Sequence, residues 1–272
     1  MNTAEFVLEN VVKRFGSKHG HVAVDRVSTR FSNTQAVGII GESGSGKSTL
    51  GRMLCGLENP TSGSIRFNGE ELADIRRSRP RLEEFRREVQ LIGQDTTSSF
   101  DPRHSLRESI MYPAMNLGGL NRRDAYEKTD EVLLQLGLAP AMADRAAGSV
   151  SGGQRQRFAI ARALIVEPRI LVCDEVVSAL DVSVQGGILN FLKTFSRTRA
   201  AGIIFISHGL PATAFISQEL MVMYQGGIVE NGPTREVVTN PAHDYTKKLL
   251  AGYHNTGDAD AHQYPEKETH VA

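Results

Sequence analysis

The stretch GESGSGKST, residues 41–49, lies between the apolar run AVGII and a helix-like segment that starts at Lys47. Gly41 and Gly46 allow the backbone to turn where a Cβ atom would clash, and Gly44 adds further freedom. The backbone N–H groups of such a turn point inward at the start of the following helix, where they attract anions. A strand, a glycine-rich turn and a helix in this order therefore predict a phosphate site at the end of a buried strand.

The spacing of this stretch, G-x-x-x-x-G-K-[ST], is that of a P-loop. Lys47 supplies a positive charge that can reach the outer phosphates of a nucleotide, and the Ser48 hydroxyl suits Mg²⁺. The alternative is a glycine-rich turn that binds nothing, but such turns rarely have a strand before them and a helix after them. The residues of this loop expected to bind a nucleotide are Gly41, Ser43, Gly44, Gly46, Lys47, Ser48 and Thr49.

The composition of the chain disfavours several classes of protein. Its 272 residues allow a large core and one inserted subdomain. Lysine and arginine together number 31, as do aspartate and glutamate, so the net charge is zero and gives no electrostatic reason to expect nucleic-acid binding. No apolar run approaches the length of a bilayer span, and the N-terminus has no apolar signal region, so secretion is not expected.

Strand and helix patterns alternate along the chain, which predicts an α/β doubly wound core of buried parallel strands. From about Thr96 to Pro168 the pattern changes to helices and loops, and we interpret this block as an insertion into the core. Residues 71–88 carry charges of both signs and are expected to form a helix with a solvated face. Strands are expected at residues 5–12, 27–31, 36–40, 64–69, 89–94, 169–175, 202–208 and 219–232, the last as a hairpin around Gln225–Gly227.

These patterns divide the chain into three segments. Residues 1–95 and 169–253 are expected to form one discontinuous α/β core, and residues 96–168 a helical subdomain. Within the latter, YEKTDEVLLQLGL has apolar residues at helical spacing and ends at Gly137. Residues 254–272 are polar and lack periodicity, so we expect them to be disordered.

The strand ILVCDE, residues 170–175, ends in two adjacent acids, Asp174 and Glu175. Side chains alternate along a strand, so the two carboxylates are expected to point in different directions. One can hold Mg²⁺ through water while the other addresses a nucleophilic water, which is the division of roles that phosphoryl transfer needs. Acids at a strand end are by themselves more often simply solvated. Beside a P-loop, the functional interpretation is favoured.

The segment VSGGQRQR, residues 150–157, has the pattern of a second anion-binding helix start. Ser151 can cap the helix, and Gly152 and Gly153 allow a ligand to approach the backbone closely. The positive end of the helix dipole then faces that ligand. An ordinary capped helix start is the alternative. Because one P-loop already fills a nucleotide site within a single chain, a second site suggests the phosphate of another subunit's nucleotide.

Six motifs together carry a family resemblance: GESGSGKST, Gln94, VSGGQRQR, ILVCDE, SALD at residues 178–181, and His208. In this order and rough spacing they resemble the ATP-binding subunits of ABC transporters, over about residues 5–252. The resemblance implies an ABC-type P-loop NTPase core with an antiparallel β portion and an inserted helical subdomain that carries SGGQ. It also implies ATP and Mg²⁺, and a second ATP-binding subunit that closes head to tail over the nucleotide.

The resemblance implies a role for each motif residue. Glu175 would polarise the attacking water, His208 would contact the γ-phosphate, and Gln94 would join Mg²⁺ and water to movements at the membrane subunit. Phe15 would stack on adenine, with a core aromatic as the alternative. The resemblance further places Ser48, Gln94 and Asp174 at Mg²⁺, Ser151, Gly152, Gly153 and Gln154 at the partner's nucleotide, and Asp181 in communication across the dimer.

A narrower resemblance rests on SALDVSVQ at residues 178–185, SSFDPRHSLRESI at residues 98–110 and NPAHDYTKKLLAG at residues 240–252. These look like the dipeptide, oligopeptide and nickel importers. That subfamily implies an identical or paralogous ATPase partner, two transmembrane permease subunits, a solute-binding protein, and a place on the cytoplasmic face of the inner membrane. The cargo would be a peptide, or nickel or another metal chelate. Residues 95–110 would lie near the groove that receives the permease's coupling helix.

Several positions depart from the family pattern. Val150 replaces a leucine, Gly209 replaces an aspartate after His208, and Thr96 removes a proline and its rigidity. VVSALD replaces the commoner PTSALD. The two cysteines, Cys55 and Cys173, lie in apolar surroundings and lack metal spacing, so we expect small buried residues in a reducing compartment. No cysteine follows Cys173, which excludes a C-terminal iron–sulfur segment.

Two other functions fit some of these motifs. A soluble ABC-type ATPase could serve a non-transport complex such as phosphonate breakdown, and this is the main alternative to an importer. Translation-type proteins usually fuse two such domains, and repair-type proteins carry a long coiled coil between the motifs. A P-loop kinase fits GESGSGKST but leaves VSGGQRQR and SALD unexplained.

Overall fold

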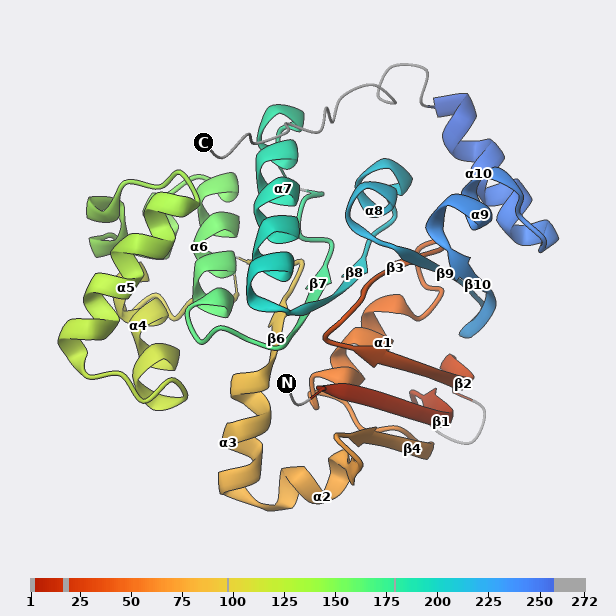
Figure 1. Cartoon of the computed structure of the whole chain (residues 1–272), viewed down its shortest axis with the longest axis horizontal. Coiled ribbons are helices and arrows are strands. Elements are labelled where there is room, and N and C mark those ends of the chain that lie inside the picture. Colours follow the sequence, from red (N-terminus) through yellow and green to blue (C-terminus); the bar gives the residue numbers. More distant parts are fainter. Residues whose placement is uncertain (1–2, 17–19, 97, 179, 257–272) are drawn as a thin grey trace.

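The computed structural model describes residues 3–16, 20–96, 98–178 and 180–256, which form a pair of sheets and the helices around them (Figure 1). The larger sheet has six strands in the order β10-β9-β3-β8-β7-β6, and only the β10–β9 pair is antiparallel. Its strands are β3 (Ala36–Ile40), β6 (Val89–Ile92), β7 (Ile170–Asp174), β8 (Gly202–Ile206), β9 (Glu219–Tyr224) and β10 (Gly227–Pro233).

The central strands β3, β7 and β8 are buried along their whole length, as continuous apolar runs predict for parallel strands. Successive residues of β7 belong to different clusters: Leu171 and Cys173 pack with the helices α6 (Gly152–Leu164) and α7 (Val182–Arg199). Ile170 and Val172 pack with the helix α1 (Lys47–Leu54) and with the smaller sheet. The parallel strands therefore end at one edge of a sheet with apolar cores on both faces.

The smaller sheet is antiparallel, with the order β2-β1-β4-β5. The strand expected at residues 27–31 is longer in the structure and begins at Val22. Arg26 has a φ of +48° and lies at a break in the β1–β2 register. This bulge interrupts the alternation of buried and exposed side chains, so the sequence pattern did not reveal the first half of the strand. The strands are β1 (Glu5–Arg14), β2 (Val22–Ser32), β4 (Ser62–Phe67) and β5 (Glu70–Glu71).

The charged segment 71–88 forms two helices, α2 (Leu72–Arg77) and α3 (Arg79–Glu88), where a single helix was expected. Pro80 lies in the first turn of α3. A proline inside one continuous helix would remove a hydrogen bond and clash with the preceding turn, but it fits the first turn of a new helix. Phe85 is buried from α3 and stacks edge-on against Phe67 of the smaller sheet.

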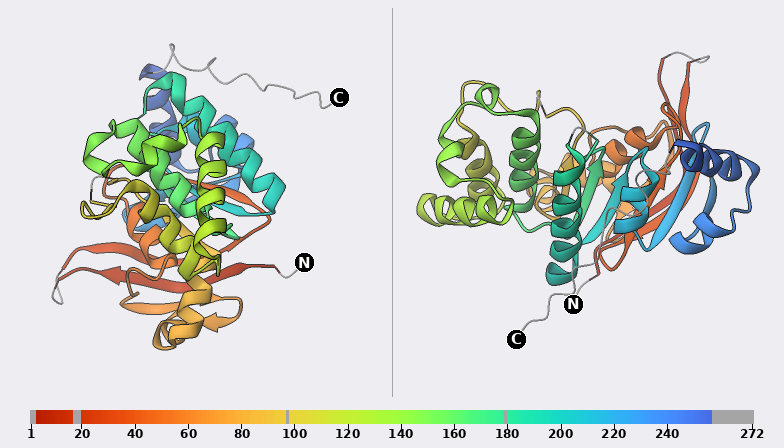
Figure 2. Two further views of the ribbon diagram at one scale, coloured as in Figure 1. Left: turned by 90° about the vertical axis from the view of Figure 1, so that its left-hand side faces the viewer. Right: turned by 90° about the horizontal axis from the view of Figure 1, so that it is seen from above.

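The helices α4 (Leu106–Asn116) and α5 (Arg122–Gln135) lie with α6 at one end of the molecule (Figures 1 and 2). The 3₁₀ turns η1 (Pro140–Asp144) and η2 (Ala147–Ser149) connect α5 to α6. Arg107 of α4 is 5% exposed and joins this group, because its guanidinium pairs with Asp144 at 2.6 Å and with Asp130 at 2.5 Å.

The last helices are α8 (Leu210–Ile216), α9 (Thr234–Thr239) and α10 (Asp244–Thr256), and α10 lies at the end of the molecule opposite α4 and α5 (Figure 2). Helix α10 runs past residue 254, where a disordered tail was expected to begin; residues 257–272 of that expected tail lie outside the described residues. Both cysteines are free thiols; Cys173 is buried as expected, whereas Cys55 is only half-buried. Among the described residues, no helix has the length and apolar character needed to cross a bilayer.

Candidate nucleotide site

A cavity of about 330 Å³ lies where the parallel strands end. The P-loop follows β3, Gln94 follows β6, Glu175 follows β7 and His208 follows β8, so the sheet topology brings four distant segments to one edge. The lining residues are Phe15, His21, Ala23, Ser43, Gly44, Gly46, Lys47, Ser48, Thr49, Gln94, Glu175 and His208.

The P-loop needs glycine at two positions for a steric reason. A Cβ atom at Gly41 would lie 2.2 Å from the backbone oxygen of Met223, and one at Gly46 would lie 2.0 Å from that of Ala23. Both residues also have positive φ, +151° and +104°. A Cβ atom at Gly44 would meet nothing within 4 Å, so that position needs glycine only for its φ of +80°.

Lys47 lies inside the loop that precedes it and is 7% exposed. Its Nζ donates hydrogen bonds to the backbone oxygens of Gly41 at 2.7 Å and Glu42 at 2.8 Å, and to Ser45 Oγ at 3.2 Å. Burial lowers the pKa of Lys47, while the nearby carboxylates oppose that change. The loop thus holds a positive charge at the floor of the cavity, where phosphate oxygens can replace the carbonyls.

Asp174 reaches the site through Ser48, because Ser48 Oγ donates a hydrogen bond of 3.0 Å to Asp174 Oδ1. Asp174 is 8% exposed, and burial raises the pKa of its carboxyl, with the Ser48 hydrogen bond opposing the shift. A hydroxyl and a carboxylate side by side are the hard oxygen ligands that Mg²⁺ prefers. The donor set present here therefore fits Mg²⁺.

Glu175 contacts a different partner, the His208 segment. Its Oε1 accepts a hydrogen bond of 2.9 Å from the backbone N–H of His208, and its Oε2 lies 2.9 Å from His208 Nδ1. Glu175 has a φ of +53°, a left-handed turn directly after β7. The Glu175 side chain is 10% exposed and that of His208 is 68% exposed, so the carboxylate is fixed at the wall while the imidazole faces the opening.

The SGGQ segment forms the start of α6 and does not line this cavity. Ser151 Oγ accepts a hydrogen bond of 3.2 Å from the Gln154 N–H, and Gln154 Oε1 accepts one of 3.0 Å from the Ser151 N–H. This reciprocal pair is a capping box. Ser151 and Gly152 are exposed, and a Cβ atom at Gly152 would meet nothing within 4 Å. Asp181, the N-cap residue of α7, is also exposed.

The structure therefore divides the predicted residues into three groups. Phe15, Gln94, Glu175, His208 and residues 43, 44 and 46–49 line one cavity, and Gly41 and Asp174 contact that lining through Lys47 and Ser48. Ser151–Gln154 and Asp181 do not line it, and Ser151, Gly152 and Asp181 are exposed. Sequence reasoning missed His21 and Ala23, which line the cavity from β2 and the turn before it. No local pattern marks them, because the smaller sheet brings them against the P-loop.

A comparison with known protein families identifies the family of this chain. Residues 24–178, more than half of the chain, match the family model described as ABC transporter. The chain belongs to the ABC transporter family. Its fold is the mixed α/β fold of this family's ATP-hydrolysing cassette, which confirms the expected fold class.

Two curated relatives are named Glutathione import ATP-binding protein GsiA. The one from Escherichia coli strain K12 is 42% identical over 252 residues, which are 90% of this chain and 40% of that protein. The one from Salmonella paratyphi A is 44% identical over 230 residues, 84% of this chain and 36% of that protein. The chain thus spans less than half the length of these ABC relatives.

Two solved structures have a similar fold. A dimeric post-hydrolysis state of the ATP-binding cassette MJ0796, bound to ADP and Pi, has a TM-score of 0.78 and 25% identity, and covers 85% of this chain and 99% of that one. The structure of cbiO1 from Clostridium perfringens, part of the transporter complex cbiONQ, has a TM-score of 0.73 and 23% identity, and covers 92% and 94%. The latter likeness concerns the fold alone.

Proposed function

We propose that this ABC cassette binds and hydrolyses Mg²⁺–ATP at a head-to-tail dimer interface and so drives import of a small solute through partner membrane subunits. The observation that carries the proposal is the separation of the two segments predicted to bind phosphate, the P-loop and the start of α6. The P-loop cavity is lined by residues of one chain and is open on one side. The capped start of α6 is exposed to solvent and does not line that cavity. A second copy or a paralogue, placed head to tail, joins one chain's cavity to the other chain's α6.

Nucleotide binding follows from the residues of the cavity. The P-loop amides and Lys47 would hold the phosphates, and Phe15, 43% exposed at the rim, would stack on adenine. Ser48 and Asp174, with Gln94 across the cavity, would hold Mg²⁺. When bound, the ion neutralises charge on the phosphate oxygens.

The hydrolytic step is assigned to Glu175 and His208. Glu175 would accept a hydrogen bond from the attacking water and take its proton as the water oxygen bonds to the γ-phosphorus and the bond to the β–γ bridging oxygen breaks. His208 would contact the γ-phosphate. The His208 backbone N–H donates to one oxygen of the Glu175 carboxylate and the His208 ring nitrogen Nδ1 lies 2.9 Å from the other, so the two side chains lie side by side. Ser151, Gly153 and their neighbours would come from the partner chain.

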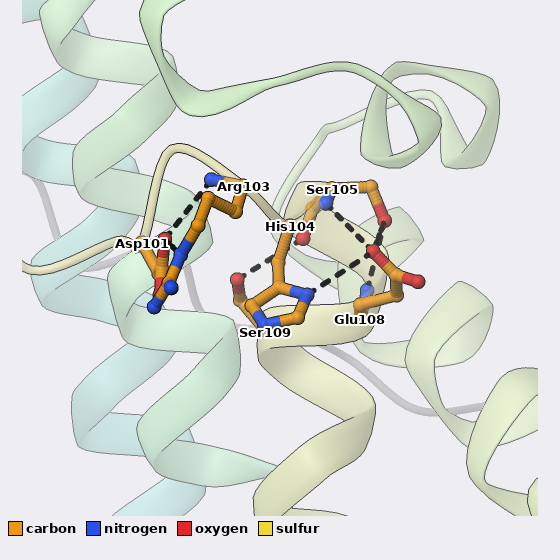
Figure 3. Close-up of polar contacts among 6 residues, drawn as sticks. All are labelled: Asp101, Arg103, His104, Ser105, Glu108 and Ser109. Carbon is orange, nitrogen blue, oxygen red and sulfur yellow. Dashed lines mark hydrogen bonds and ion pairs between the residues drawn. The ribbon is translucent and has the colours of Figure 1, made fainter.

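Coupling to a membrane subunit is assigned to a second cavity, of about 710 Å³, on α4 and the loop before it. Figure 3 shows how this loop is fixed: Asp101 binds Arg103, Ser105 and Glu108 form a capping box, and His104 Nδ1 lies 3.8 Å from Glu108 Oε2. A loop with these internal contacts beside exposed apolar side chains such as Tyr112, 71% exposed, suits docking of a permease segment.

The cargo is proposed from the relatives' names. A glutathione importer carries a small peptide, which agrees with a peptide as substrate; nickel or another metal chelate is the second choice. The complete assembly would then hold two ATPases, two permeases and an external solute-binding protein, with this chain on the cytoplasmic face of the inner membrane. A soluble ATPase for phosphonate breakdown remains the alternative function.

The test is a pull-down of the tagged chain from gently solubilised membranes, with mass spectrometry of the proteins that accompany it. Two multi-span proteins and a second ATPase are expected, and their identities narrow the cargo. Tyr112→Glu should lose the membrane proteins, because it places a charge on the apolar wall of the docking cavity. Lys47→Ala is the control and should retain them. A set of soluble enzymes, with no membrane protein, would favour the phosphonate alternative.

A further inference from the structure

Helix α10 carries a stripe of side chains that packs against segments bordering the candidate nucleotide site. Tyr245, Leu249 and Tyr253 are spaced by four residues, so they share one side of the helix. All three pack against the apolar cluster that contains Ile40 and Leu210. Ile40 is the last residue of β3 before the P-loop, and Leu210 follows the His208 turn. One helix therefore lies across two of the segments that build the site.

The first tyrosine of the stripe holds the P-loop. Tyr245 Oη accepts a hydrogen bond of 3.0 Å from the backbone N–H of Glu42, whose carbonyl accepts one of 2.8 Å from Lys47 Nζ. The Tyr245 ring stacks on Tyr224 at a centroid distance of 4.1 Å, which fixes its direction. Burial raises the pKa of Tyr245, so its hydroxyl stays neutral at physiological pH.

The second tyrosine holds the turn after β8. Tyr253 Oη donates a hydrogen bond to the backbone oxygen of His208, whose N–H is bound by Glu175 at 2.9 Å. Burial raises the pKa of Tyr253 to about 12, so the hydroxyl keeps its proton. The residue after His208 is Gly209, which starts α8 without a side-chain cap. The Gly209 N–H donates a local hydrogen bond of 3.0 Å to Ser207 Oγ, so the Tyr253 hydrogen bond adds a restraint on the His208 carbonyl from outside the turn.

We propose that Tyr245 and Tyr253 are positioning residues of the ATPase site, through which α10 holds the P-loop at Glu42 and the catalytic turn at His208. Eight residues separate them, about 12 Å along the helix axis. Tyr245 acts on the residues that bind phosphate, and Tyr253 acts on the pair that handles water and the γ-phosphate. The inference rests on the proposed ATP hydrolysis and assigns different kinetic effects to the two hydroxyl groups.

The experiment replaces each tyrosine by phenylalanine, which keeps the ring. Tyr245→Phe should raise the KM for ATP and the Kd for a fluorescent ATP analogue about three- to tenfold, with kcat little changed. Tyr253→Phe should lower kcat by a similar factor while the Kd stays at the wild-type value. Tyr224→Phe is the matched control, because it keeps the stack and its hydroxyl contacts only Gln225 among the hydrogen bonds of the described side chains.

Two further readouts do not depend on turnover. Amide hydrogen exchange at the exposed Glu42 should accelerate in Tyr245→Phe alone, since that variant removes the acceptor of its N–H. The ring-proton resonances of His208 should shift in Tyr253→Phe alone. A wild-type chain that binds ATP without hydrolysing it would refute the proposed function, and these two readouts would still decide the roles of the tyrosines. Equal changes of KM and kcat in both variants, or behaviour like that of Tyr224→Phe, would overturn the inference.

Discussion

The P-loop and the start of α6 are both predicted to bind an anion through backbone amides, but they differ in what requires their glycines. At Gly41 and Gly46 a Cβ atom would strike backbone oxygens of the same chain at 2.2 and 2.0 Å. At Gly152 nothing lies within 4 Å. Packing within the chain therefore requires glycine at positions 41 and 46, whereas position 152 has room for a side chain. A requirement for glycine at residue 152 would have to come from outside the chain.

The largest effect is expected from Glu175→Gln, which leaves the cavity intact but removes the carboxylate proposed to accept the proton of the attacking water. Hydrolysis should fall by about 10²-fold or more, because general-base assistance typically contributes that much. ATP binding should persist, since no P-loop contact changes. ATPase assays beside nucleotide titrations measure both, and Glu131→Gln, an exposed acid on α5, is the control. Turnover near the wild-type rate would remove Glu175 from its proposed role.

Substitution of two glycines by alanine tests the comparison itself. Gly46→Ala should lower the free energy of unfolding by about 1–3 kcal/mol or more, because the methyl group clashes with the Ala23 oxygen at a strained φ. Nucleotide binding should be lost with it. Gly152→Ala should leave stability within about 0.5 kcal/mol of wild type. Denaturant unfolding measures both values. If the two substitutions cost the same, the steric distinction between the sites is wrong.

Ser151→Arg tests whether the start of α6 acts on another subunit. The arginine should block closure of the ATP-bound dimer while the monomer's Kd for ATP stays nearly unchanged, because Ser151 lies outside the cavity. Loss of the capping box should cost about 1 kcal/mol of stability. Size-exclusion chromatography with ATP, in the Glu175→Gln background, follows closure.

Ser105→Arg supplies the matched control for that experiment. Ser105 caps α4 with the same reciprocal pair, here with Glu108, but α4 lies beside the proposed permease groove. Loss of the Ser105 capping box should lower the free energy of unfolding by a similar amount and leave ATP-driven dimerisation intact. A joint fall of ATP affinity and closure in Ser151→Arg would contradict an action across the interface.

The sequence predicted the parallel sheet better than the smaller one. Strands such as β3 and β8 are continuous apolar runs, so composition alone marks them. The bulge at Arg26 interrupts the alternation of buried and exposed residues that would have marked the start of β2. Residues 71–88 are charged throughout, which suggested one helix, but Pro80 divides the segment into two helices. Local interruptions of a pattern, rather than weak patterns, account for these errors.

The cavity residues were predictable where a motif carries the chemistry, as at Lys47 and Glu175. Ala23, which lines the cavity, and Tyr245, which lies behind the P-loop, were not predictable, because their contacts join segments far apart in sequence. Ala23 offers only a backbone oxygen close to Gly46, which no side-chain pattern can signal. Tyr245 belongs to a helix whose apolar spacing predicts packing, and its hydroxyl contact with Glu42 appears only in three dimensions.

The smallest effect concerns the carboxylate beneath the P-loop. Burial raises the pKa of Asp174 in the folded chain above its unfolded value, so the fold favours the protonated acid. Stability is then lost as pH rises from the unfolded pKa toward the folded one, and ionised Asp174 is a cost at neutral pH. Asp174→Asn keeps an oxygen to accept the Ser48 hydrogen bond. It should raise the unfolding temperature at pH 7 in the absence of Mg²⁺ and nucleotide, by an amount that shrinks in acid.

Asp244→Asn gives the opposite sign and serves as the control for this titration. Lys247 lowers the pKa of Asp244 at the exposed start of α10, so ionised Asp244 favours the fold and its loss should slightly lower the unfolding temperature at pH 7. Thermal scans of both variants between pH 4 and pH 8 compare the two carboxylates directly. A destabilised Asp174→Asn at neutral pH would mean that the P-loop site gains stability from a charge it buries, and that the carboxylate proposed to bind Mg²⁺ also stabilises the fold around it.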